Sequence, residues 1–165
     1  IRTAEESGSP LRIIRAADEV NRSLVGRLIE KMRAELSSFD GRTIAVLGLS
    51  FKPNTDDIRE APALRLIDRI LAEGALVHAY DPAAMENVRR IYGDRIAFFG
   101  DSYSAVAGAD AVVIMTEWNE LRVLDLGRIK TLMRSPAFFD CRNIYKNAEM
   151  AAWGFRYHSF GRPAS

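Results

Sequence analysis

The stretch GRTIAVLGLSFKPNTDDIREAP, from Gly41 to Pro62, decides the fold. Its residues 43–49 form a continuous apolar run, which is typical of a strand buried on both faces of a parallel sheet. Gly48 allows a turn at the end of this run, and a charged loop follows before a proline opens the next helix. A strand that ends in a charged loop and then a helix is where α/β proteins usually bind a phosphate-bearing ligand.

The rest of the chain alternates short apolar runs with helical patterns. Further strands are predicted at residues 76–80, 96–99, 111–115, 137–139 and 155–159, and helices at 62–72, 83–92, 102–107, 124–133 and 149–153. Ser102 is expected to cap the third of these helices. This alternation with short connections predicts a Rossmann-like three-layer α/β fold with a six-stranded parallel sheet.

A long helix is predicted before this sheet. Apolar residues recur at helical spacing from residue 11 to residue 36, at Ile13, Ala17, Val20, Leu24, Leu28, Met32 and Leu36. A helix of this length spans roughly 40 Å, more than the width of a small domain. We therefore expect it to pack on another domain or subunit, with packing on its own domain as the alternative. The predicted organisation is a flexible lead-in at 1–10, the helix at 11–38 and the Rossmann-like domain at 39–165.

Composition narrows the class of protein. The 165 residues carry a formal net charge of +1, which argues against a nucleic-acid-binding arm. No apolar run approaches the length of a membrane span, and no signal peptide is visible, so no membrane partner is expected. The single cysteine, Cys141, excludes an internal disulfide and a zinc cluster, and favours a cytoplasmic location.

Cations follow the predicted strands at the edge where parallel sheets bind ligands. Lys52 and Arg142 lie nearest the predicted switch point of strand order, and Arg59 lies near the start of the next helix. Together they suit a ligand with a diphosphate, because guanidinium groups match phosphate oxygens and lysine supplies a point charge. The alternative is that Lys52 and Arg59 form surface ion pairs with carboxylates of the same loop, Asp56, Asp57 and Glu60.

Other polar residues have plainer interpretations. The sequence contains neither GxGxxG nor GxxxxGK[ST], so a nucleotide ligand would be held mainly by side chains. Asp81 stands where dinucleotide-binding folds place a ribose-binding acid, but a turn aspartate before Pro82 is the favoured interpretation. Packing roles are expected for Cys141, His78, His158, Trp118 and Trp153, with an interface as an alternative for the tryptophans. No metal site is expected.

Several blocks resemble one known family. GLSFKPNTDDIREAP, residues 48–62, is similar to the signature of the C-terminal domain of the UDP-glucose/GDP-mannose dehydrogenase family. GALVHAYDP, DAVVIMTEW, FFDCRNIY and GFRYHSFGRP follow in the family's order, and AADEVN at 16–21 resembles its central dimer-forming helix. Within the family the blocks most resemble UDP-glucose 6-dehydrogenases, with GDP-mannose and UDP-N-acetylmannosamine dehydrogenases as near alternatives.

The resemblance implies a function and its residues. The implied reaction is the two-step oxidation of UDP-glucose to UDP-glucuronate, with NAD as the cofactor. Phe51 and Lys52 would contact the UDP-sugar, Arg142 would bind the sugar nucleotide, Arg59 would reach NAD held by another domain, and Asp57 and Glu60 would shape the loop.

The sequence departs from the family pattern at two residues and lacks two of the family's segments. Ala61 replaces a serine, and Cys141 replaces a glycine whose backbone conformation is then in question. The family's GGxCFPKD segment, with its catalytic cysteine, and the N-terminal NAD-binding domain do not occur in this sequence. We interpret the chain as the C-terminal part of such an enzyme, inactive alone and forming a homodimer through the long helix. The alternative is a non-catalytic nucleotide-binding or dimerisation module.

Overall fold

Six parallel strands form the centre of the molecule. The computed structural model describes the backbone of residues 12–160 and the side chains of 23–160, so the predicted lead-in at 1–10 lies outside the described residues. The strands are β1 (Thr43–Leu47), β2 (Leu76–Tyr80), β3 (Ala97–Phe98), β4 (Ala111–Ile114), β5 (Ala137–Asp140) and β6 (Arg156–Ser159). Their order in the sheet is β3-β2-β1-β4-β5-β6, and every neighbouring pair is parallel. The predicted sheet is confirmed, and its order reverses between β1 and β4.

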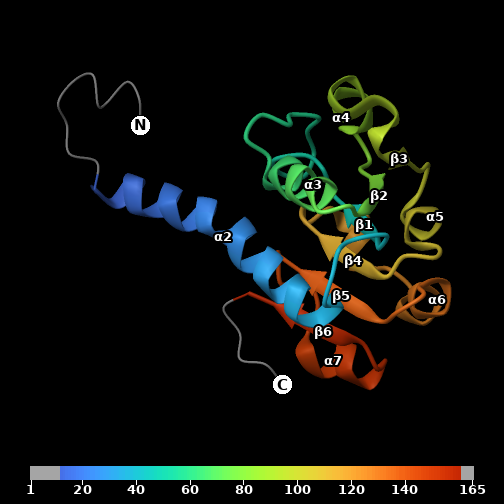
Figure 1. The fold of residues 1–165 in the computed structure, drawn as a ribbon. Helices are drawn as coiled ribbons and strands as arrows, with labels where there is room; N and C mark the ends of the chain where they lie inside the picture. Colours follow the sequence, from blue (N-terminus) through green and yellow to red (C-terminus); the bar gives the residue numbers. More distant parts are fainter. Residues whose placement is uncertain (1–11, 161–165) are drawn as a thin grey trace.

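Helices cover both faces of the sheet (Figure 1). They are α2 (Arg12–Leu36), α3 (Pro62–Ala72), α4 (Met85–Tyr92), α5 (Ser102–Val106), α6 (Leu126–Leu132) and α7 (Asn147–Ala152), with 3-10 turns η1 (Gly93–Arg95) and η2 (Asn119–Arg122). Ile44 and Val46 pack into a core under α2, α3 and α4, whereas Ala45 and Leu47 pack into a second core under α5, α6 and α7. Burial on both faces explains why β1 reads as a continuous apolar run.

Two local predictions are corrected by the structure. The first strand ends at Leu47 rather than at residue 49, because Gly48 adopts a left-handed φ of +85° and turns the chain. The cap of α5 is Asp101 rather than Ser102. Its carboxylate accepts a hydrogen bond of 2.9 Å from the backbone N–H of Ser104, while Ser102 is the first residue inside the helix.

The long helix α2 is attached to the sheet by its second half. Its buried residues there are Val25, Leu28, Ile29, Met32 and Leu36. Glu35 pairs with Arg156 and His158 of β6, the latter at 3.0 Å, and Lys31 donates to the main-chain oxygen of Ser159 at 2.7 Å. Figure 1 shows the first half of α2 extending beyond the sheet and its other helices. Within the described residues, no helix combines the length and the apolar character that crossing a bilayer requires.

Candidate functional site

A pocket opens at the carboxyl edge of the sheet, where the strand order reverses between β1 and β4. Its volume is about 280 Å³, and its walls come from α2, from the loops after β1, β4 and β5, and from the segment after β6. The lining residues are Leu24, Val25, Leu28, Phe51, Glu60, Pro62, Arg65, Met115, Cys141, Arg142 and Phe160. The pocket therefore lies at the position where open parallel sheets generally bind ligands.

Arg142 and Phe51, two of the predicted site residues, line this same pocket. The Nε of Arg142 donates to the main-chain oxygen of Met115 at 2.7 Å and lies 3.1 Å from a carboxylate oxygen of Glu117. Within the described residues, no hydrogen bond or ion pair engages the two terminal guanidinium nitrogens. Phe51 is 49% exposed, unusual for a large apolar side chain. The pocket is thus lined by both a guanidinium group of fixed orientation and a partly exposed aromatic ring.

Lys52 and Arg59, the other two predicted site residues, do not line the pocket. Arg59 binds the carboxylate of Asp57 with Nε at 3.0 Å and a terminal nitrogen at 2.7 Å, as the ion-pair alternative predicts. The hydrogen bonds from Arg59 lower the pKa of Asp57 to about 2. Lys52 is exposed at the tip of the same loop, and among the described residues it has no ion-pair partner. The ion-pair alternative therefore applies to Arg59 and not to Lys52.

Loops at this edge hold unfavourable backbone conformations. Asn54 and Glu60, in the loop after β1, have left-handed φ angles of 61° and 57°, and Asn143, after β5, has one of 55°. Asparagine tolerates this region, but glutamate enters it at a cost of about 1 kcal/mol or more. Cys141 has no such angle, so the glycine of the family pattern is not needed there. Strain of this kind is often stored at binding sites.

Asn143 forms hydrogen bonds with Phe160, the last residue that the structure describes and one of the residues that line the pocket. Its side-chain amide donates to the main-chain oxygen of Phe160 at 2.9 Å, and its side-chain oxygen accepts from the Phe160 N–H at 3.1 Å. Lys31 of α2 lies over the Phe160 ring, 4.9 Å from the centroid. Cys141, between these elements, is half-buried, and burial raises the pKa of its thiol. A raised pKa disfavours the reactive thiolate, in agreement with the predicted packing role.

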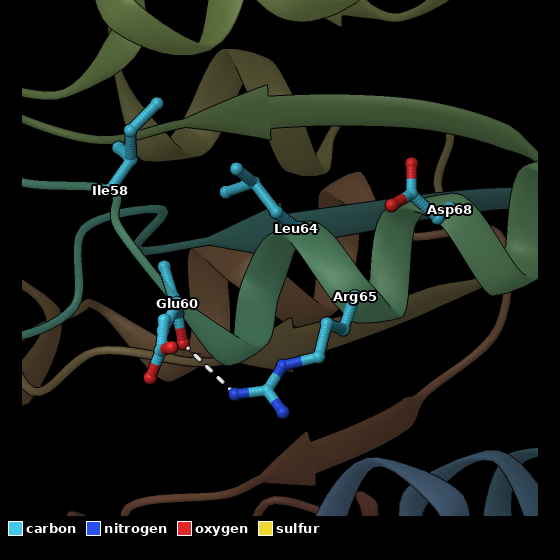
Figure 2. Close-up of a pocket in the computed structure, with 6 residues that line it drawn as sticks. Ile58, Glu60, Leu64, Arg65 and Asp68 are labelled. Carbon is cyan, nitrogen blue, oxygen red and sulfur yellow. Dashed lines mark hydrogen bonds between the residues drawn. The ribbon is translucent and has the colours of Figure 1, made fainter. Parts of the chain in front are cut away.

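A second hollow lies on the outer side of α3. Its volume is about 380 Å³, and its lining residues are Ile58, Glu60, Ala61, Leu64, Arg65 and Asp68. Figure 2 shows Arg65 reaching back to the main-chain oxygen of Glu60, a hydrogen bond of 3.0 Å, while Asp68 leaves α3 in another direction. Glu60 and Arg65 line both hollows, so they form the wall between them. The hydrogen bond from Arg65 thus reaches the residue that has a left-handed φ angle.

Asp81 follows β2 and is fully buried. One carboxylate oxygen accepts from the backbone N–H groups of Ala83 and Ala84, at 2.9 and 2.8 Å, which is the predicted turn. The other accepts from the N–H groups of Leu49 and Ser50, at 2.7 and 3.0 Å. In a dinucleotide-binding fold the β1 turn faces a pyrophosphate and the β2 acid faces a ribose. Here the two groups bind each other.

Sequence reasoning missed part of the site. Pro62 ends the charged motif and Arg65 follows it by three residues, so their position next to the motif could have indicated them as site residues. Leu24 and Leu28 belong to the apolar stripe of α2, but only the docking of the helix on the sheet brings them to the pocket. Phe160 lies within the GFRYHSFGRP block, but nothing in the sequence indicated that its side chain lines the pocket. In the part of the chain that the structure describes, no three His, Cys, Asp or Glu side chains gather in a way that could hold a metal ion.

Comparison with known proteins agrees with this geometry. Residues 45–147 match the UDP-glucose/GDP-mannose dehydrogenase family, UDP binding domain. UDP-glucose 6-dehydrogenase TuaD of Bacillus subtilis is 41% identical over 99% of this chain and 36% of its own length. UDP-glucose 6-dehydrogenase of Rhizobium meliloti is 43% identical over 99% of this chain and 37% of its own length.

Solved structures show the same likeness. A UDP-glucose dehydrogenase of Pyrobaculum islandicum superposes with a TM-score of 0.79 at 31% identity, covering 96% of this chain and 34% of the other. A UDP-D-ManNAc dehydrogenase of Pyrococcus horikoshii gives 0.72 at 28% identity, covering 93% of this chain and 34% of the other. This chain spans little more than a third of the length of its curated relatives. With its sheet, its switch-point pocket and these matches, the chain belongs to the UDP-glucose/GDP-mannose dehydrogenase family.

Proposed function

We propose that this chain is the UDP-sugar-binding part of an NAD-dependent UDP-glucose 6-dehydrogenase, which oxidises UDP-glucose in two steps to UDP-glucuronate. The relatives that match nearly the whole chain carry that name. The observation that carries the proposal is Arg142, because its guanidinium group is oriented through Nε beside an open pocket while its terminal nitrogens remain available. Two parallel N–H donors of this kind match the oxygens of a phosphate group.

Each site residue has a part in the proposed complex. Arg142 binds the diphosphate with its two terminal nitrogens. Lys52, exposed and without an ion-pair partner among the described residues, supplies a second positive charge from the loop tip. Phe51 offers an aromatic face to the nucleotide, which would cover a ring that is 49% exposed in this structure.

NAD is the proposed oxidant, and the residues of this chain do not fit it in the usual way. The N–H groups that follow β1 and the acid that follows β2 are engaged with each other, so neither is available to a dinucleotide. We propose that NAD, which accepts the hydride, is held by the remaining part of the protein. Arg59, whose side chain is 87% exposed, would reach NAD after leaving Asp57.

The long helix and the location complete the proposal. The first half of α2 extends away from the sheet (Figure 1), and we propose that it joins the two parts of the protein and forms a homodimer. A helix of 25 residues is too long to pack along its whole length against this sheet. The one cysteine is free and half-buried, which is compatible with the proposed cytoplasmic setting.

Calorimetric titration with UDP and UDP-glucose tests the proposal. Arg142→Ala and Lys52→Ala each remove a charged partner of the diphosphate, so each is expected to weaken binding about tenfold or more. Arg69→Ala is the matched control, because Arg69 is an exposed cation in the last turn of α3, toward the opposite edge of the sheet. The control should leave affinity unchanged. Equal affinity in the wild type, Arg142→Ala and Lys52→Ala would refute the site.

A further inference from the structure

Ser50, the residue before Phe51 in the loop after β1, is hydrogen-bonded by two other loops, those after β2 and β4. Its N–H and its hydroxyl both donate to Asp81, each at 3.0 Å. Its main-chain oxygen accepts from the Thr116 hydroxyl at 2.6 Å, and its hydroxyl accepts from the Trp118 indole N–H at 3.1 Å. Three strands, β1, β2 and β4, therefore converge on the residue that precedes the two loop residues of the proposed site.

Asp81 is the centre of this arrangement. Its Oδ2 accepts from the N–H groups of Leu49 and Ser50, from the Ser50 hydroxyl and from the Trp118 indole, the last at 3.1 Å. Asp81 is 0% exposed, Ser50 1% and Trp118 9%. A buried carboxylate must be satisfied by hydrogen bonds, so this geometry is strongly specified. After Ser50 the chain leaves this buried arrangement: the Phe51 N–H donates to the Asp57 oxygen at 2.8 Å, and the Phe51 side chain is 49% exposed.

We propose that Asp81 and Trp118 are positioning residues of the nucleotide site. They fix Ser50, and through it they fix the direction in which Phe51 and Lys52 leave the sheet. Asp81 takes the place that a ligand phosphate has at the β1 turn of dinucleotide-binding folds, so the turn is ordered before any ligand arrives. Binding then does not have to order this loop, which lowers the entropic cost of association. The inference rests on the proposed function.

The chain contains a matched control at the opposite edge of the sheet. Asp110 is 1% exposed, so it is as deeply buried as Asp81, and its carboxylate is also hydrogen-bonded. Its carboxylate accepts from the Thr43 N–H at 2.9 Å, from Arg134 at 2.7 Å and from Arg42 at 3.3 Å. Because these contacts lie at or just before the starts of β1, β4 and β5, they are at the edge of the sheet opposite the pocket. Asp110→Asn is therefore expected to affect stability without affecting the site.

The experiment compares Asp81→Asn with Asp110→Asn in the full chain. An asparagine keeps the shape of Asp81 but turns an N–H₂ group toward backbone donors, so both variants should melt below the wild type. UDP affinity is expected to fall at least tenfold in Asp81→Asn and to stay within twofold in Asp110→Asn. Equal affinity losses in the two variants would show a general stability effect, and unchanged affinity in Asp81→Asn would also overturn the proposal.

Amide hydrogen exchange separates this inference from the proposed function, because it needs no ligand. The N–H groups of Leu49 and Ser50 should exchange at least tenfold faster in Asp81→Asn, while Asp110→Asn leaves them protected. Should Asp81→Asn fail to fold, Trp118→Phe keeps the ring and removes one donor, and threefold faster exchange at Ser50 is expected. Failure of the wild type to bind UDP would refute the proposed function alone. Unchanged exchange in these variants would refute the positioning role alone.

Discussion

Gly48→Ala tests how the sheet forms its switch point. Gly48 has a φ of +85°, and its N–H donates to the Tyr80 oxygen at 2.8 Å. An alanine methyl would lie 2.7 Å from both the Cβ and the backbone nitrogen of Thr116. The left-handed conformation costs alanine about 1–2 kcal/mol, and overpacking costs about 1–3 kcal/mol. The expected loss in free energy of unfolding is therefore about 3 kcal/mol.

Gly108→Ala is the control that isolates the close approach. Gly108 has a φ of +71°, but a methyl placed there meets no atom within 4 Å. Only the backbone penalty remains, so a loss of about 1 kcal/mol is expected. For a protein of this size these losses correspond to roughly 6–12 °C for Gly48→Ala and roughly 2–4 °C for Gly108→Ala.

Urea unfolding followed by circular dichroism measures both losses, and calorimetry with UDP measures the effect on the site. Since Thr116 also donates to the Ser50 oxygen, displacement of Thr116 by the new methyl should weaken UDP binding. Gly108→Ala should bind UDP as the wild type does. If the two variants lost the same free energy of unfolding, the close contact between residue 48 and Thr116 would contribute nothing to the loss. That result would refute the prediction.

Three further predictions follow from local contacts. Ala61→Ser gives α3 the side-chain cap that it lacks, and should raise the free energy of unfolding by about 1 kcal/mol in thermal melts; an unchanged melting temperature would contradict this. An NMR titration of Asp57 should give a midpoint near 2, shifting toward 3.8 in Arg59→Ala, whereas a wild-type midpoint near 3.8 would show that the pair does not form in solution. Burial alone would raise the pKa of Glu35, but hydrogen bonds from β6 outweigh it and lower the pKa below 4.5. Glu35→Gln should therefore cost about 1–2 kcal/mol at pH 7, and urea melts should show that difference shrinking as the pH falls below 4.5, since protonation removes the same contribution; a difference independent of pH would contradict it.

Strands β1, β4 and β5 could be predicted because burial on both faces leaves a strong signal in the sequence. Their ends could not be predicted as well, since they depend on single backbone angles such as that of Gly48. The cap of α5 shows the same limit. Asp101 and Ser102 are both good capping residues, and the extended backbone of Asp101, with φ −153° and ψ 163°, decides between them. The residue types alone therefore do not show which of the two caps the helix.

The site was predictable to the extent that it follows from topology. Strand ends predicted that Lys52 and Arg142 lie at one edge of the sheet, because carboxyl ends of parallel strands share an edge, but only Arg142 lines the pocket. The sequence could not show which loop cation forms an ion pair, since Lys52 and Arg59 both have carboxylates nearby. Only the conformation of the loop places Asp57 beside Arg59. The following Pro82 predicts that Asp81 is a turn aspartate, which accounts for the hydrogen bonds to one of its oxygens. The donors to the other oxygen come from distant loops and leave no local pattern.

The size of the pocket bears on how tightly this chain alone should bind. Pockets that enclose most of a drug-sized ligand measure about 300–1,000 Å³, and this one measures about 280 Å³. We therefore expect these residues to enclose a nucleotide with a diphosphate and a sugar only partly. Positive charge and a preorganised loop remain available in the chain, so we expect it to bind UDP weakly and UDP-glucose little better. A large gain in affinity from the glucose unit would show that the sugar is also recognised here, and would contradict this expectation.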